Sequence, residues 1–219
     1  MKKTIIISSI TAVLFVLTSC AGVIEVKTPG ISGGKIAAKS EKKKFKPVLF
    51  EDFEAGTAVG SYSYANTGGN ASAEKFIATL DEKHGGNYSA YSSFDTGADG
   101  AWGVGIGTQS AYGGGYIDAK DRDTFSIWVK APAGMPFYFF CNEAQDNGGD
   151  GEFWNSPNQT GTGKWDLYEV SMDEFYKNIY SGNQEGNNAV DMTAMGTVGL
   201  QFSGSVGKGT VYIDDIYFK

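Results

Sequence analysis

The sequence predicts an all-β domain that folds as a sandwich of two β-sheets. Glycine accounts for 31 of the 219 residues, about twice its usual share. The chain is also rich in aromatic residues, with 12 Tyr, 14 Phe and 4 Trp. Aromatic residues favour strands and glycines mark the turns between them, while long runs with helical spacing are few. These observations together indicate many short strands.

Short strand-like runs alternate with turns rich in Gly, Asn and Asp from residue 48 onward. About ten or eleven such runs suit a two-sheet sandwich. The expected strands are 48–53, 61–64, 73–80, 88–94, 101–106, 115–119, 124–130, 137–142, 164–170, 197–202 and 210–218. Only residues 171–180 and 189–195 are compatible with short helices.

Alternation along three of these runs indicates which side chains face the core. In "TFSIWVK", Phe125, Ile127 and Val129 share one face of the strand, because successive side chains point to opposite faces. Runs 137–142 and 197–202 also have one uniformly apolar face. Their other face mixes aromatic and amide side chains, which is unusual for a plain solvated surface.

The N-terminus carries a targeting signal. "MKK" is followed by an apolar run too short for a comfortable membrane span. "LTSC" then resembles the lipobox of bacterial lipoproteins, although an ordinary secretory signal is the alternative. We predict a lipoprotein signal peptide at 1–19, lipidation of Cys20, a flexible linker at 20–46 and a single domain at 47–219. The expected location is a membrane-anchored lipoprotein at the cell surface, outer membrane or periplasm.

Charge restricts the partners of the domain. Residues 47–219 carry nine Lys or Arg against 23 Asp or Glu, a net charge of −14. Nucleic acid is therefore excluded as a partner, because its phosphates would be repelled. Neutral ligands or cations are compatible with this charge. If Cys20 carries lipid, Cys141 lacks a disulfide partner and is expected to be a small buried hydrophobic residue.

Five motifs follow one another along the domain and cover nearly all of 47–219. They are "VLFEDFEAGTA" at 48–58, "DEKHGGNYSAYSSF" at 81–94, "DTFSIWVKAPAG" at 123–134, "GTGKWDLYEVSMDEF" at 161–175 and "GTVYIDDIYF" at 209–218. In this order they resemble the β-jelly-roll carbohydrate-binding modules, with family 11 or the broader galactose-binding-like group as nearest relatives. The resemblance implies a jelly-roll sandwich that binds glycans.

The resemblance also implies a structural calcium ion. It nominates Glu54 with Asp214 or Asp215, together with backbone oxygens of the loop that ends at Asn87. Asp52 is a further candidate, two positions from Glu54 on the same face. Calcium prefers six to eight oxygen ligands, so carboxylates in a closing strand suit it. Strand parity leaves the choice between Asp214 and Asp215 open, with a lean toward Asp215. The alternative is that this pair guards a strand edge.

Aromatic residues in polar, glycine-rich surroundings are the candidates for stacking on sugar rings. Amide and acidic side chains nearby are candidates for hydrogen bonds to hydroxyl groups. The predicted ligand-binding residues are Trp102, Trp154, Tyr62, Tyr64, Tyr138, Glu143, Asp146 and Gln201. For Trp128, the surrounding sequence leaves open whether the side chain packs in the core or binds a ligand.

No catalytic residue is predicted, so the expected function is non-catalytic binding of a polysaccharide such as a β-glucan or a similar plant or microbial glycan. A monomer is expected. One alternative is a glycan-active enzyme that uses acidic residues of the loop 143–152. The other alternative is a sandwich domain that binds protein. With His84 as the one histidine of the chain, a histidine-based zinc site is excluded.

Overall fold

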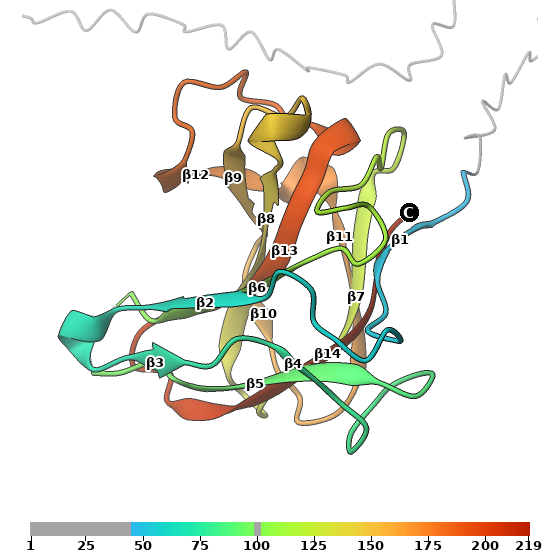
Figure 1. The fold of residues 1–219 in the computed structure, drawn as a ribbon. Coiled ribbons are helices and arrows are strands. Elements are labelled where there is room, and N and C mark those ends of the chain that lie inside the picture. The colour runs from blue at the N-terminus through green and yellow to red at the C-terminus, as the bar shows by residue number, and fades with distance from the viewer. Residues whose placement is uncertain (1–44, 99–101) are drawn as a thin grey trace, which may run out of the picture. The chain divides into compact units, whose positions relative to one another are not determined.

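The computed structural model describes residues 45–98 and 102–219, which form two antiparallel β-sheets (Figure 1). The predicted two-sheet sandwich is confirmed. The signal peptide, Cys20 and the linker up to residue 44 lie outside the described residues, so these assignments stay predictions. Within the described ranges, no helix is long and apolar enough to cross a membrane.

The first sheet is built around the last strand of the chain. Its order is β11-β7-β14-β5-β3, with β1 also paired to β14 and β4 paired to β5. The strands are β1 Val48–Glu51, β3 Ser72–Ala73, β4 Ile77–Thr79, β5 Ser89–Asp95, β7 Thr124–Lys130, β11 Asp166–Ser171 and β14 Lys208–Phe218.

The second sheet has the order β12-β9-β8-β13-β6-β2, with β10 paired to β8. Strand β12 therefore lies at one edge and β2 at the other. The strands are β2 Tyr62–Ala65, β6 Val104–Gln109, β8 Pro136–Glu143, β9 Glu152–Asn155, β10 Gln159–Thr160, β12 Tyr176–Gly182 and β13 Met195–Phe202.

The core lies between the two sheets, where the predicted alternation places it. Phe125, Ile127 and Val129 of β7 are buried in it. The matching apolar faces of β8 and β13 are buried there too. Cys141 is buried and free, and burial raises the pKa of its thiol, which agrees with the expected structural role. Burial of these apolar side chains is the main force that holds the sheets together.

A β-bulge interrupts the closing strand at its acidic pair. The pairing of β14 with β7 shifts register between Asp214 and Tyr217, and Asp215 has a φ of 49°. Such a bulge adds a residue to one strand, so simple parity fails across it. Asp214 is 1% exposed, while Asp215 is partly exposed. The two carboxylates therefore differ in exposure, although their oxygen atoms lie within 4.8 Å of each other.

The expected helices at 171–180 and 189–195 are largely wrong. Only single 3-10 turns form there, at Met172–Glu174 and Met192–Ala194. Residues 176–182 instead form β12, which pairs with β9. Local preference in so short a segment is weak, and pairing with an existing sheet edge overrides it.

Candidate functional site

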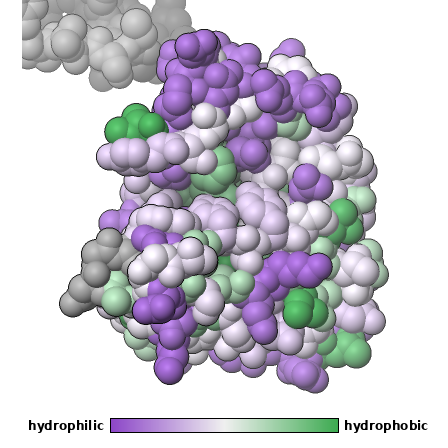
Figure 2. All heavy atoms as spheres, turned by 60° about the vertical axis from the view of Figure 1, so that its left-hand side comes forward, coloured by the Kyte–Doolittle hydropathy of each residue, from purple (hydrophilic) through white to green (hydrophobic). Residues whose placement is uncertain are grey.

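A groove of about 830 Å³ lies on the outer face of the second sheet. Strands β2, β8, β9 and β13 supply residues of its floor, and the edge strand β12 forms a wall. Figure 2 shows this side of the molecule, with strongly hydrophilic residues gathered at the top above a paler band. The groove is lined by Tyr64, Trp102, Tyr138, Asn155, Tyr176, Lys177, Asn178, Ile179, Tyr180, Ser181 and Gln201.

Glycines of β6 allow tyrosine rings to lie flat against the sheet. Tyr64 pairs with Gly105, and Tyr62 pairs with Gly107. A Cβ on Gly105 would lie 2.0 Å from Cζ of Tyr64, and a Cβ on Gly107 would lie 2.8 Å from Cζ of Tyr62. No such contact is sterically possible, so these strand glycines are required by the close approach of the rings.

Aromatic rings form a connected platform along one side of the groove. The ring of Tyr64 lies 6.2 Å from that of Tyr62, with an interplanar angle of 22°, and 5.7 Å from that of Trp102. Phe140, fully buried on this outer face, lies 6.1 Å from Tyr64. Trp102 is 50% exposed, so the platform ends in a large aromatic ring that faces solvent.

The tyrosine hydroxyls of this platform stay protonated at physiological pH. Burial raises the pKa of Tyr62 and that of Tyr138 to about 12. Burial also raises the pKa of Tyr64. Each of these phenols therefore remains a neutral hydrogen-bond donor.

Two amide side chains add polar groups to the floor. Gln201 is buried, and its Nε2 donates a hydrogen bond to the carbonyl of Trp102 at 3.1 Å. Asn155 is 7% exposed, and its Oδ1 accepts no hydrogen bond. Buried polar atoms nearly always have a partner, so an orphaned acceptor in a groove floor indicates a place for a ligand donor or a water.

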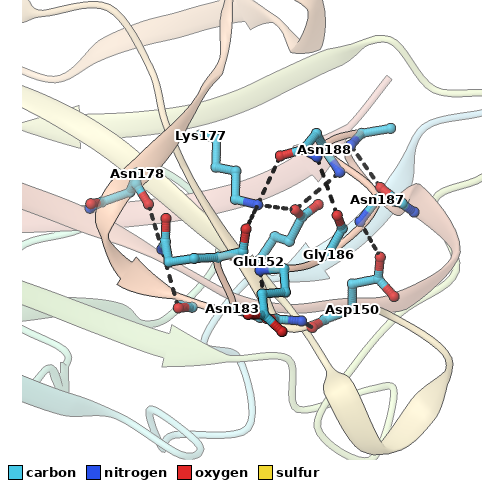
Figure 3. Close-up of polar contacts among 12 residues, drawn as sticks. Asp150, Glu152, Lys177, Asn178, Asn183, Gly186, Asn187 and Asn188 are labelled. Atoms are coloured by element: carbon cyan, nitrogen blue, oxygen red, sulfur yellow. Dashed lines mark hydrogen bonds and ion pairs between the residues drawn. The ribbon is translucent and has the colours of Figure 1, made fainter.

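The β12 wall carries exposed apolar side chains, yet it is firmly attached. Tyr176, Ile179 and Tyr180 are 53%, 68% and 92% exposed. The attachment is an ion pair between Nζ of Lys177 and Oε1 of Glu152, a carboxylate with no exposed surface (Figure 3).

The loop that follows β12 joins the same network. Nζ of Lys177 also donates to the Gln184 carbonyl at 3.1 Å and to Oδ1 of Asn188 at 3.0 Å. Asn187 donates its backbone N–H to Oδ2 of Asp150 at 2.6 Å, as Figure 3 shows. These contacts position the wall relative to β9.

Charge in the groove is balanced. Among the lining residues, which all belong to the described part of the chain, Lys177 is the one with a charged side chain, and Glu152 neutralises it. A neutral ligand therefore meets no net charge there.

The predicted ligand-binding residues fall into two groups. Trp102, Tyr64, Tyr138 and Gln201 line the groove, and Tyr62 stacks behind Tyr64. The other three lie elsewhere. Asp146 is in a separate 3-10 turn, Gln145–Asn147, and it is not a lining residue; Trp154 and Glu143 are buried.

The expectation for Trp154 and Glu143 is corrected by their burial. Trp154 belongs to the core, and its Nε1 donates to Oε1 of Glu143 at 2.9 Å. Glu143 also accepts backbone N–H groups of Asp150, Glu152 and Asp191. Trp154 thus has no free face for a sugar ring, and Glu143 anchors the backbone of neighbouring loops.

Asn155 and residues 176–181 also line the groove, although none of them is among the predicted ligand-binding residues. Most of the segment lies in residues 171–180, whose sequence is compatible with a short helix rather than with a groove wall. A useful signal was present in the alternation of 152–155, because Asn155 has the opposite parity to Trp154.

The candidate calcium ligands hold backbone N–H groups. Oε1 of Glu54 accepts from Asn87 and Tyr88 at 2.7 and 2.9 Å. Oδ2 of Asp214 accepts from His84 and Gly85 at 3.0 and 3.1 Å. The loop 84–88 thus turns donors toward both carboxylates, where a calcium site requires oxygens.

The other two candidates are also engaged. Oδ1 of Asp52 accepts from the backbone N–H of Glu54 and from the hydroxyl of Tyr112. Oδ2 of Asp215 lies 3.1 Å from Nδ1 of His84. Ligand atoms of His84, Asp214 and Asp215 lie within 4.8 Å of one another, but a set that includes imidazole is unlike the all-oxygen set of calcium. The expected calcium site does not fit these contacts.

Solved structures match the chain in three dimensions. The family 11 carbohydrate-binding module of a cellulosomal cellulase of Clostridium thermocellum matches with a TM-score of 0.58 at 17% identity, over 80% of this chain and 95% of that one. The family 11 module of that bacterium in complex with a β-1,3-1,4-mixed-linked tetrasaccharide gives 0.58 at 19%, over 78% and 94%.

This chain has the fold of the carbohydrate-binding modules. A family 30 carbohydrate-binding module also matches, with a TM-score of 0.51 at 14% identity over 80% of this chain and 88% of that one. No protein-family model matches the sequence, and no curated protein matches it. The fold predicted from the five motifs is therefore confirmed by shape.

Proposed function

We propose that residues 47–219 bind a neutral polysaccharide without catalysis, in the groove on the outer face of the second sheet. The observation that carries this proposal is the aromatic platform of Tyr64 and Trp102 in a groove that is also lined by Asn155 with its orphaned acceptor. Sugar rings have apolar faces that stack on aromatic rings and hydroxyls that need polar partners. This combination of a flat apolar surface and convergent polar groups is typical of a ligand site.

Charge and shape favour a flat, uncharged glycan such as a β-glucan. The lysine in the groove is already paired, so a carboxylated sugar gains no free cation there. One module that shares the fold is solved with a mixed-linked tetrasaccharide, which supports β-glucans as the first ligands to test.

A glycan-active enzyme is disfavoured. Glycoside hydrolysis uses two carboxyl groups that flank the bond to be cleaved. None of the described residues that line the groove is an Asp or a Glu. Within the loop 143–152, Glu143 and Glu152 are buried and bound to protein groups.

Affinity electrophoresis in gels that contain mixed-linked β-glucan, xylan or mannan tests the proposal. Trp102→Ala should abolish the retardation of the protein, because loss of one stacking ring costs about 1–3 kcal/mol by analogy with base stacking. That corresponds to a loss of affinity of roughly tenfold to hundredfold. Tyr112→Ala removes an exposed aromatic ring outside the groove and is the matched control. Retention of the wild-type protein in none of the gels would favour a protein-binding sandwich instead.

We also propose that the module is held at a membrane through lipid on Cys20. The "LTSC" motif after the apolar run supports this proposal. The wild-type protein should partition into the detergent phase, and Cys20→Ser should move it to the aqueous phase. A Cys20→Ser variant that is still processed and membrane-bound would contradict the proposal.

A further inference from the structure

We propose that the outer face of the first sheet carries a second, smaller saccharide site, which takes a single neutral sugar residue. It lies in a pocket of about 360 Å³, here called the Ser126 pocket. The inference goes beyond the groove, because the two sites are on different sheets and share no residue. The pocket is lined by Pro47, Ser126, Trp128, Leu167, Asp215, Tyr217 and Lys219.

The floor of the pocket holds an unpartnered hydroxyl. Ser126 faces outward on β7, since its neighbours Phe125 and Ile127 face the core. The residue is 1% exposed, and its Oγ makes no hydrogen bond. A buried hydroxyl without a partner is costly, and most are satisfied. A ligand hydroxyl on the pocket floor would remove that cost.

Aromatic side chains stand on either side of this hydroxyl. Tyr217 pairs with Ser126 across β14 and β7, and Trp128 follows two positions along β7. The indole of Trp128 stacks on the imidazole of His84, with ring centroids 3.6 Å apart and an interplanar angle of 13°. His84 is itself held by Asp215. The indole is thereby fixed before any ligand arrives, which lowers the entropy cost of binding.

The rim supplies polar groups of both signs. Asp215 provides a carboxylate that can accept several hydrogen bonds. Lys219 provides an ammonium group whose charge is balanced by Glu169 at 2.7 Å. A ligand with an apolar face and several hydroxyls matches this combination of aromatic walls and polar rim.

The size of the pocket limits the ligand. Its volume is near the lower end of the range of about 300–1,000 Å³ that is typical of small-molecule sites. One sugar residue, free or at the end of a chain, suits this space better than the middle of an extended chain. With a groove on the other outer face, one domain would hold two glycan elements at once.

The indole N–H signals of the tryptophans in an NMR titration report on the two sites separately. The probes are the methyl β-glycosides of glucose, galactose, mannose and xylose, added to the wild-type protein. The signal of Trp128, assigned with Trp128→Phe, should shift saturably with at least one of them. The same shift should persist in Trp102→Ala, which removes an aromatic ring of the groove. Loss of glycan binding in the groove is thereby distinguished from loss of binding in the Ser126 pocket.

Substitution of the floor and wall decides whether the pocket is responsible. Ser126→Ala should weaken the affinity read at Trp128 by roughly fivefold, which is the effect of one lost hydrogen bond. Tyr217→Ala should weaken it further, and Ser203→Ala, in an exposed loop, should leave it unchanged. The proposal is overturned if the Trp128 signal shifts with none of the four glycosides. It is equally overturned if Ser126→Ala and Tyr217→Ala both bind like the wild-type protein while remaining folded.

Discussion

Glycines on the outer face of the second sheet decide where the aromatic rings lie. A Cβ on Gly199 would lie 2.3 Å from Cζ of Phe140, just as Gly105 leaves room for Tyr64. The absence of a side chain at these positions is therefore part of the candidate site. Two acidic residues have a structural role of the same kind. Asp214 and Glu54 accept hydrogen bonds from backbone N–H groups of the loop 84–88.

Gly105→Val should weaken glycan binding more than it weakens the fold. The new side chain would displace the Tyr64 ring and, through it, Trp102, while valine itself favours strands. We expect a loss of affinity of about tenfold or more in affinity electrophoresis, in line with the loss of one stacking ring. Gly68→Ala is the control, since its Cβ would meet nothing closer than 3.4 Å. Unchanged binding by Gly105→Val would show that the ring position is unimportant.

The ionisation of Asp214 should make the protein less stable as pH rises from about 4 to about 7. Burial raises the pKa of Asp214 from 3.8 to about 6 in the folded protein. The folded state therefore binds the proton more tightly than the unfolded state, and its advantage is lost as pH rises through the folded pKa. The free energy of unfolding of the wild-type protein minus that of Asp214→Asn, measured in urea, should fall over this range. If the difference rises instead, a bound cation or the N–H groups hold the carboxylate ionised.

At the scale of elements, the edge strand β12 turns an open sheet face into a groove. It contributes six of the lining residues, Tyr176 to Ser181, and it is held by pairing with β9 and by the buried ion pair of Lys177 with Glu152. An edge strand with exposed apolar side chains is normally a risk for aggregation. Here these side chains face the groove, which gives their exposure a function under the proposal above.

Lys177→Met should destabilise the protein by about 3–5 kcal/mol, because it leaves the Glu152 carboxylate buried and unpaired. The double variant Lys177→Met/Glu152→Met should be more stable than Lys177→Met alone, since the uncompensated charge is gone. Chemical unfolding of both variants and of Glu152→Met completes the double-mutant cycle. Strictly additive effects would show that the pair is not coupled. Glycan affinity measured on the folded double variant reports whether the ion pair also positions the wall.

At the scale of the whole molecule, each of the two outer faces of the sandwich carries a cavity of its own. The second sheet carries the groove, and the first sheet carries the Ser126 pocket beside the loop 84–88. The last strand, β14, pairs with both β1 and β5, so the two ends of the domain meet in one sheet. Carboxylates that accept backbone N–H groups tie the loop 84–88 to these ends.

Chelation should leave the melting temperature of the domain unchanged, because N–H groups occupy the places that calcium ligands would need. Asp214→Ala and Glu54→Ala should each lower the melting temperature in the presence or absence of chelator. A melting temperature that falls in chelator and recovers with calcium would restore the calcium expected from the family resemblance. Bound ligand at about 100 times its dissociation constant adds roughly 2.7 kcal/mol, so such an effect would be measurable.

Sequence alone determined the sandwich, its core faces and four of the groove residues. Alternation is local, so Phe125, Ile127 and Val129 reveal their common face without any tertiary information. Trp102, Tyr64, Tyr138 and Gln201 were found because their types and surroundings suit an exposed platform.

Only the tertiary structure decided which polar and aromatic residues are buried together. Trp154 and Glu143 satisfy each other inside the protein, and β12 exists because β9 offers it an edge to pair with. The bulge at Asp215 likewise depends on the register between strands far apart in the chain. Such long-range pairing leaves no local pattern in the sequence. The sequence therefore indicated candidate binding residues, but it did not predict which of them lie together in the groove.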